Sequence, residues 1–327
     1  PELQNIMGTV DTHIRHDAKG NTRQYFKYHP SAFGKCLRNM QYMRYVAMGL
    51  IKVEKEEFDS KLLRLFGKGH NMHARWESYF AGMGVLRGVW RCLNPLCSMF
   101  DDKGKLIVGV DPKGAYKAPV RKYGLDEKLG VFQPKKCLCG CNKFAYEEAC
   151  VVSEEMNMFG HVDLIVDFSN LDVSRFDGVP ISFDIDKLPK SPVVIDMKTM
   201  NDYRWKNSLM RTGPDLGYRV QLCIYANLLD LDYGMLIYEN KNNSEARPYK
   251  IEKASDTMFD LIKKQAVSMN EMAACDKPKL PPPRCSDKSD YECSNCAFKP
   301  LCHKSAIWKD KKGLSDKQKK FYGNLIK

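Results

Sequence analysis

The chain has 327 residues, of which 43% are hydrophobic and 28% charged, and its net charge at pH 7 is +12. This composition excludes a disordered chain, and no stretch approaches the roughly 18 apolar residues that a membrane span needs. Residues 1–21 lack the apolar segment of a secretion signal, so we expect a cytoplasmic protein with no membrane partner. The positive charge either keeps the protein soluble or binds a polyanion, for which nucleic acid is the first candidate.

The predicted elements mix helices and strands. A helix is predicted over residues 29–50, with Ser31 as its N-cap. A second helix is predicted over residues 58–80, where spacings of three and four place His70 and His73 on one largely apolar face. Strands are then predicted over 144–152, 157–168, 192–197 and 234–238, and helices over 219–229 and 258–272. We therefore predict an α/β fold with a mixed sheet.

Most of the 13 cysteines are clustered, and without a secretion signal thiolate–metal sites are favoured over disulfides. Residues 92–141 are rich in Gly, Pro and Lys, have no sustained periodicity and carry cysteines near both ends, so bound metal would tie this stretch down. The pattern is typical of a zinc ribbon. Because a single intervening residue makes a cramped chelate, Cys141 is preferred to Cys139. The predicted Zn²⁺ ligands are Cys92, Cys97, Cys137 and Cys141.

Two carboxylates and a lysine form the strongest chemical pattern. Asp196 and Lys198 are two residues apart in a predicted strand and therefore project from the same face. Asp163 lies in a neighbouring apolar run that would bury it. Converging buried carboxylates are costly unless a cation such as Mg²⁺ neutralises them. Such a metal polarises a phosphate and activates water, while the lysine orients that water or stabilises developing charge. The alternative is a strand-end ion pair without function.

The following helix carries Gln221 and Tyr225 on one face. Together these residues resemble the PD-(D/E)xK nuclease superfamily, specifically its RecB-like branch, whose motifs occur in the same order. The resemblance implies a restriction-endonuclease-like mixed sheet flanked by helices, with catalysis by Asp163, Asp196, Lys198, Gln221 and Tyr225. It also implies Mg²⁺ or Mn²⁺ held by His73, Asp163 and Asp196. Val162 replaces the proline that names the superfamily, His70 shares the face of His73, and His161 is interpreted as a neighbour of the metal rather than a ligand.

The resemblance extends to the cysteines. Iron–sulfur members of this branch carry one cysteine in an N-terminal Ser-x-x-x-x-Cys-x-Arg helix, which matches Ser31, Cys36 and Arg38, and three cysteines near the C-terminus. The resemblance therefore implies a [4Fe–4S] cluster. The competing interpretation is a local zinc site that uses Cys285. The implied cluster ligands are Cys36, Cys293, Cys296 and Cys302, and those of the zinc alternative are Cys285, Cys293, Cys296 and Cys302.

These patterns divide the chain into four predicted parts. They are a helical part of the nuclease domain (1–91), a zinc-ribbon-like insertion (92–141), a nuclease core (142–275), and a C-terminal cysteine-cluster segment with a basic tail (276–327). The resemblance implies a metal-dependent deoxyribonuclease, an exonuclease that processes DNA ends in recombination or replication. The alternatives are a non-catalytic DNA-binding adaptor and a structure-specific endonuclease. The expected partners are DNA and a helicase, single-strand-binding or recombination protein, and the lack of an ATPase P-loop fits a phage-encoded enzyme in the host cytoplasm.

Overall fold

The computed structural model describes residues 2–20, 26–51, 59–107, 120–180, 182–275, 279–285, 291–294 and 296–304. Part of the predicted insertion (108–119) and most of the predicted basic tail (305–327) lie outside these residues. Among the helices that the structure describes, none combines the length and apolar character needed to cross a membrane.

The N-terminal part is helical: α1 (Glu2–Gly20), α2 (Pro30–Phe33), α3 (Leu37–Ala47) and α4 (Ser60–Gly82). The single helix predicted over residues 29–50 is wrong, because the chain breaks into α2 and α3. At Gly34 the backbone approaches Gly217 so closely that a Cβ would lie 2.2 Å from the Gly217 Cα atom. Cys36 then takes an extended conformation and caps α3, while His29 rather than Ser31 is the N-cap of α2.

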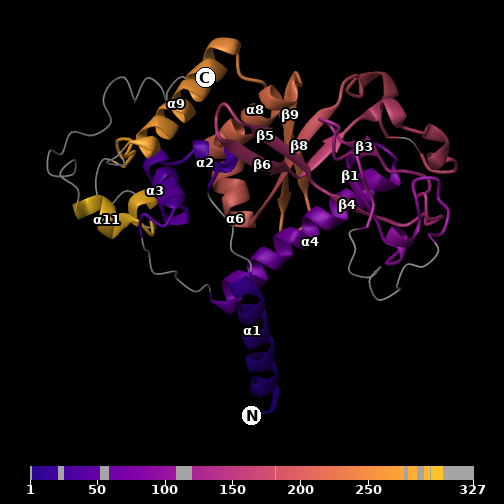
Figure 1. Ribbon diagram of the computed structural model, residues 1–327, viewed down its shortest axis with the longest axis horizontal. Coiled ribbons are helices and arrows are strands. Elements are labelled where there is room, and N and C mark those ends of the chain that lie inside the picture. The colour runs from indigo at the N-terminus through magenta and orange to yellow at the C-terminus, as the bar shows by residue number, and fades with distance from the viewer. Residues whose placement is uncertain are drawn as a thin grey trace.

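The described strands form an eight-stranded sheet and a separate two-stranded sheet (Figure 1). The main order is β10-β9-β8-β7-β1-β2, and β3 and β4 also pair with β1. Among the described strand pairs only β8 and β9 are parallel, so the sheet is mixed, as predicted, and it is mainly antiparallel. The small sheet contains β5 (Ala149–Ser153) and β6 (Met158–Val162). The strands of the large sheet are β1 (Leu86–Cys92), β2 (Lys122–Tyr123), β3 (Val131–Phe132), β4 (Phe144–Glu147), β7 (Leu164–Val166), β8 (Val193–Met200), β9 (Tyr233–Asn240) and β10 (Ala246–Glu252).

Helices cover both faces of the central strands, which explains why β8 is buried over its first five residues. On one face, α8 (Leu216–Leu229) packs Leu222 against Val194 of β8. On the other face, Met72 of α4 packs against Ile195 and Met197. Asp196 is two residues from Val194, so its side chain projects from the face of the sheet that α8 covers.

The remaining helices connect or flank this core. In Figure 1, α9 (Asp256–Ala274) and α11 (Lys299–Lys304) lie beside α3, and α1 projects away from the sheet. The other described helical segments are α6 (Asp202–Arg204), the π-helix η5 (Trp205–Leu209), α7 (Met210–Thr212), α10 (Tyr291–Ser294), and the 3-10 turns η1 (Cys97–Met99), η2 (Phe168–Asn170), η3 (Val173–Phe176) and η4 (Ile185–Lys187).

Two of the predicted strands are each divided in the structure. The strand predicted over residues 144–152 becomes β4 and β5, because β4 pairs with β1 whereas β5 pairs with β6. The strand predicted over residues 157–168 becomes β6 and β7, because β7 leaves the small sheet to pair with β1 and β8. The two divisions fall at Glu148 and Asp163, so both residues lie where the chain passes from one sheet to the other.

Candidate active site

Asp196 and Lys198 project from the same face of β8, as their spacing predicts. The Lys198 Nζ atom lies 2.7 Å from Asp196 Oδ2, and Asp196 is only 2% exposed. The Lys198 ammonium group also lies over the Tyr218 ring, 4.9 Å from its centroid. From α8, the Gln221 amide donates a 3.1 Å hydrogen bond to Asp196 Oδ1. The carboxylate is therefore held from two directions, by a cation and by a neutral donor.

Burial and neighbouring charges set the pKa values of this pair. It raises the pKa of Asp196 to about 7, and although Lys198 opposes this rise, the nearby charge of Asp163 adds to it. For Lys198, burial alone lowers the pKa, but the carboxylates of Asp196 and Asp163 outweigh burial and raise it. The lysine is thus a cation at neutral pH, and the excess negative charge around it favours a bound cation.

Asp163 lies between β6 and β7 and faces α4. Its Oδ2 atom accepts a 2.8 Å hydrogen bond from the Met197 backbone and lies 3.6 Å from Nδ1 of His73. His70 is exposed, so the rotation of α4 brings His73 and not His70 to the carboxylate. One turn beyond His73, burial raises the pKa of Glu77, and the charge of Asp163 raises it further.

A third residue, Glu148, joins His73 and Asp163. One ligand atom from each of these side chains lies within 4.8 Å of the other two, a grouping suited to a metal ion. Glu148 is not among the predicted site residues, because a single strand predicted through residues 144–152 gives this position no special role. Asp196, predicted as a ligand beside His73 and Asp163, is not in the close group and instead contacts Lys198 and Gln221.

Tyr225 has a supporting position. Its hydroxyl donates a 2.8 Å hydrogen bond to the His161 carbonyl of β6. A Cβ at Gly160 would lie 2.8 Å from that hydroxyl and 3.0 Å from the ring of Pro30, so this strand position requires glycine. Tyr225 therefore anchors the strand that leads to Asp163. His161 is exposed and lies outside the described metal-binding groups.

A second group of potential ligands lies in the predicted insertion. It contains Cys92 at the end of β1, Cys97, Cys137 and Cys139, whose sulfur atoms all lie within 4.8 Å of one another. The Cys92–Cys139 and Cys97–Cys137 sulfur pairs are 3.6 Å apart. A tetrahedral zinc ion with Zn–S bonds of about 2.3 Å separates its sulfurs by about 3.8 Å, so this soft donor set fits Zn²⁺.

The fourth member of this cysteine group is Cys139 and not the predicted Cys141. The Cys137 amide donates to the Cys141 carbonyl at 2.7 Å and the Gly140 amide donates to the Cys137 carbonyl at 2.8 Å. Gly140 has a φ of +84°, which closes this turn and brings the Cys139 thiol to the other three. The turn therefore relieves the strain expected for two cysteines with one intervening residue, while the Cys141 thiol contacts the Lys143 backbone.

The Tyr123 hydroxyl contacts the Cys137 sulfur at 3.2 Å. Burial raises the pKa of Cys137, but hydrogen bonds from Tyr123 and the neighbouring cysteines outweigh burial and lower it to about 7. A thiol with such a pKa gives up its proton readily, as a metal ligand must.

The C-terminal cysteines pack against α3, which begins next to Cys36. The Asn39 amide donates to the Cys296 sulfur at 3.1 Å, and the buried Arg38 guanidinium donates to the Cys302 sulfur at 3.6 Å. Phe298 stacks on Tyr42 with ring centroids 5.0 Å apart. The start of α3 and the C-terminal cysteine segment thus meet here.

The cysteines of this C-terminal group are buried or half-buried. Burial raises the pKa of Cys36, although backbone hydrogen bonds from Arg284, Asn39 and Arg38 oppose the rise. Cys285 forms a hydrogen bond with Cys293 and so stays close to the group. Within the described residues these cysteines do not form a tight group like that around Cys92.

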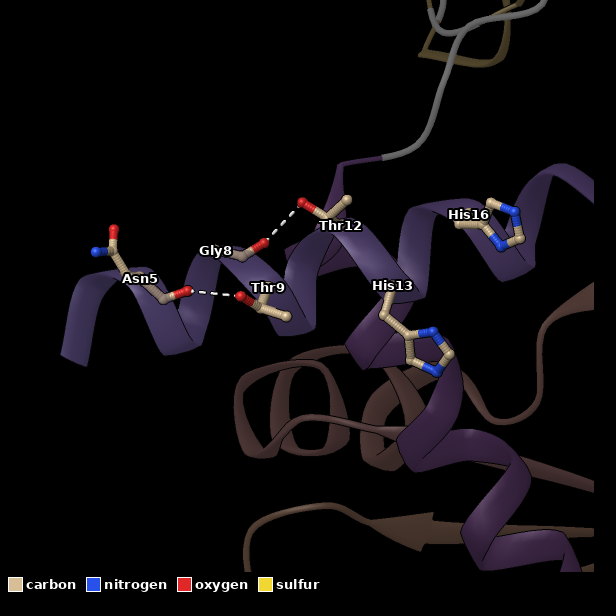
Figure 2. A pocket seen from close by; sticks show the side chains of 6 residues that line it. All are labelled: Asn5, Gly8, Thr9, Thr12, His13 and His16. Atoms are coloured by element: carbon tan, nitrogen blue, oxygen red, sulfur yellow. Dashed lines mark hydrogen bonds between the residues drawn. The ribbon is translucent and has the colours of Figure 1, made fainter. Parts of the chain in front are cut away.

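A shallow hollow lies on α1, away from these groups (Figure 2). The Thr9 and Thr12 hydroxyls on it donate to the helix carbonyls of Asn5 and Gly8. Because these polar groups are satisfied within the helix, the hollow gives no reason to place the active site there.

Comparison with family profiles agrees with this site. Residues 153–303 match the sequence profile described as the PD-(D/E)XK nuclease superfamily. No curated protein matches the chain. Among solved structures, the chain is similar to the protein of the structure titled "Crystal structure of SSO0001", at 15% identity and a TM-score of 0.39, over 92% of this chain and 98% of that one. The matched segment includes Asp163, Asp196 and Lys198, and residues 153–303 thus carry a domain of the PD-(D/E)XK nuclease superfamily.

Proposed function

We propose that this protein is a metal-dependent DNA nuclease of the RecB-like branch, and specifically an exonuclease that processes DNA ends in recombination or replication. The observation that carries the proposal is the ion pair between the buried Asp196 and the half-buried Lys198, which adjoins Asp163 at the centre of the sheet. A non-catalytic adaptor has no need to keep a lysine 2.7 Å from an aspartate that is buried, where charge is costly.

The PD-(D/E)XK nucleases use divalent metals, and the carboxylates and imidazole present here suit Mg²⁺ or Mn²⁺. We propose that His73, Asp163 and Asp196 hold the ion. When bound, such an ion lowers the pKa of a water molecule and polarises the phosphate that the water attacks.

The protein's own groups then have separate tasks. The Lys198 ammonium orients the attacking water or stabilises the charge that develops on the phosphoryl oxygens. Gln221 keeps the Asp196 carboxylate in one orientation through its hydrogen bond. Tyr225 fixes β6 and thereby the position of Asp163. The net charge of +12 attracts the DNA backbone.

We further propose a [4Fe–4S] cluster on Cys36, Cys293, Cys296 and Cys302, and a structural Zn²⁺ ion on the group around Cys92. The cluster would join the N-terminal and C-terminal segments, as the contacts of Arg38 and Asn39 suggest. The expected partners are a helicase, a single-strand-binding protein or a recombination protein, and a phage-encoded enzyme in a host cytoplasm fits such a role.

The test uses DNA substrates that differ only in their ends. Linear single- and double-stranded DNA with labelled ends is digested with Mg²⁺ or Mn²⁺ beside covalently closed circles of the same sequence. The proposal predicts loss of the linear DNA and survival of the circles. Rapid cleavage of the circles would instead favour the structure-specific endonuclease, and no cleavage of any substrate by the fully loaded protein would favour the adaptor.

A further inference from the structure

Asp163 lies at the end of two antiparallel ladders. In the pairing of β7 with β8, Leu164 is opposite Ile195, so continuing the register by one residue places Asp163 opposite Asp196. In the pairing of β5 with β6, Ala149 is opposite Val162, so the same continuation places Glu148 opposite Asp163. The backbone pairing alone therefore puts a carboxylate residue on each side of Asp163.

The side chains follow this placement. One oxygen of Glu148, one oxygen of Asp163 and one imidazole nitrogen of His73 lie within 4.8 Å of one another. Ions such as Mg²⁺ hold their ligands at about 2.1 Å, so two ligands of one ion are at most about 4.2 Å apart. Small side-chain rotations are thus enough to bring all three donors onto a single cation.

Nearby groups make a cation at this position favourable. Glu77 adds another carboxyl on the same helix as His73, and its raised pKa reflects burial and the charge of Asp163. The half-buried Tyr146 contacts the same groups, since its hydroxyl donates to the Asp163 carbonyl at 3.1 Å. Burial raises the pKa of Tyr146, and the charges of Glu148, Glu77 and Asp163 raise it further. The carboxylates of Glu148, Glu77 and Asp163 repel one another unless a cation lies between them.

We propose that Glu148 is a further ligand of the catalytic cation, together with His73 and Asp163. This inference rests on the proposed function. It assigns a carboxylate from the crossover between β4 and β5 to the site, in addition to the strand and helix residues that the superfamily resemblance implies. The position is firmly held, because the preceding residue, Glu147, pairs with Val89 of β1.

Glu147 supplies a matched control. It has the same chemistry as Glu148 and is its neighbour in sequence, but its carboxylate pairs with Arg91 at 2.9 Å and Lys122 at 2.5 Å. It is thus engaged by surface cations and is absent from the group around Asp163. Removing one negative charge has a similar general effect at either glutamate, whereas removing a metal ligand weakens Mn²⁺ binding only at Glu148.

The experiment is calorimetric titration of Mn²⁺ into the purified protein with its cysteine sites loaded. Mn²⁺ is suitable because carboxylate and imidazole donors bind it better than thiolates do. We expect Glu148→Gln to weaken Mn²⁺ binding by at least about tenfold. Asp163→Asn should abolish binding, and Glu147→Gln should leave it unchanged. Circular dichroism and thermal unfolding show whether each variant is folded.

Wild-type Mn²⁺ affinity in a folded Glu148→Gln variant would overturn the assignment, and so would equal losses in Glu148→Gln and Glu147→Gln. Unchanged binding in Asp163→Asn would overturn it as well, because the cation would then lie elsewhere. The titration requires no DNA. A wild-type protein that binds Mn²⁺ but cleaves no DNA would therefore refute the proposed function, while the comparison of the two glutamates would still decide the role of Glu148.

Discussion

Replacing Cys139 by serine should remove one zinc ion per chain, whereas replacing Cys141 should not. The four sulfurs of Cys92, Cys97, Cys137 and Cys139 lie within 4.8 Å of one another, with two pairs at 3.6 Å, close to the spacing in a tetrahedral thiolate site. A structural zinc ion contributes about 10–16 kcal/mol of apparent binding free energy in small zinc domains. Losing one of four thiolates should therefore empty the site and loosen the segment around β2.

The assay is metal content by mass spectrometry on wild-type protein and the two serine variants, combined with limited proteolysis. Cys139→Ser should show about one zinc equivalent less than the wild type and faster cleavage between residues 92 and 141. Cys141→Ser should match the wild type in both measurements. The reasoning is refuted if the two variants exchange these results, or if both retain the full zinc content.

Two further predictions concern the supporting structure of the site. Gly160→Ala should destabilise the protein by about 1–3 kcal/mol, because its Cβ would overlap the Tyr225 hydroxyl and Pro30. Thermal unfolding of a double-mutant cycle with Tyr225→Phe should show a smaller combined loss than the sum of the single losses, and simple additivity would contradict this contact. Protein prepared without oxygen should be brown, with absorbance at roughly 400 nm and about four irons per chain, and Cys36→Ser should bleach it. A colourless preparation that contains only zinc would support the local zinc alternative.

Elements with strong local patterns could be predicted from the sequence. The structure confirms the strands predicted over 192–197 and 234–238 as β8 and β9, and the helices predicted over 219–229 and 258–272 as α8 and α9. The spacing of Asp196 and Lys198 also predicted their shared face, because strand geometry alone determines it.

The breaks in the elements could not be predicted in this way, because they depend on residues distant in sequence. Glu148 and Asp163 interrupt strands only because the two halves pair with different partners. The helix α2 ends at Gly34, where the backbone of Gly217 in α8 leaves no room for a Cβ. Glu148 was missed for this reason, since its role depends on a crossover between two sheets that no local periodicity reveals.

The sequence also could not decide which of two neighbouring candidate ligands reaches a metal site. His70 and His73 are on the same predicted face, and only the packing of α4 on the sheet brings His73 to Asp163. Cys139 and Cys141 are distinguished by the turn at Gly140, whose positive φ redirects the chain. In both cases the residue types indicated a metal site, while the tertiary structure determined which residue reaches it.

The most direct test of the central claim is single-turnover DNA cleavage by Lys198→Ala with saturating Mn²⁺. Lys198 contacts Asp196 at 2.7 Å but is not among the proposed metal ligands, so its removal separates catalysis from metal binding. The account predicts a fall in the cleavage rate of at least about 10²-fold, as for loss of an electrostatic stabiliser, with Mn²⁺ and DNA binding largely retained. A folded Lys198→Ala protein that cleaves DNA at nearly the wild-type rate would contradict it.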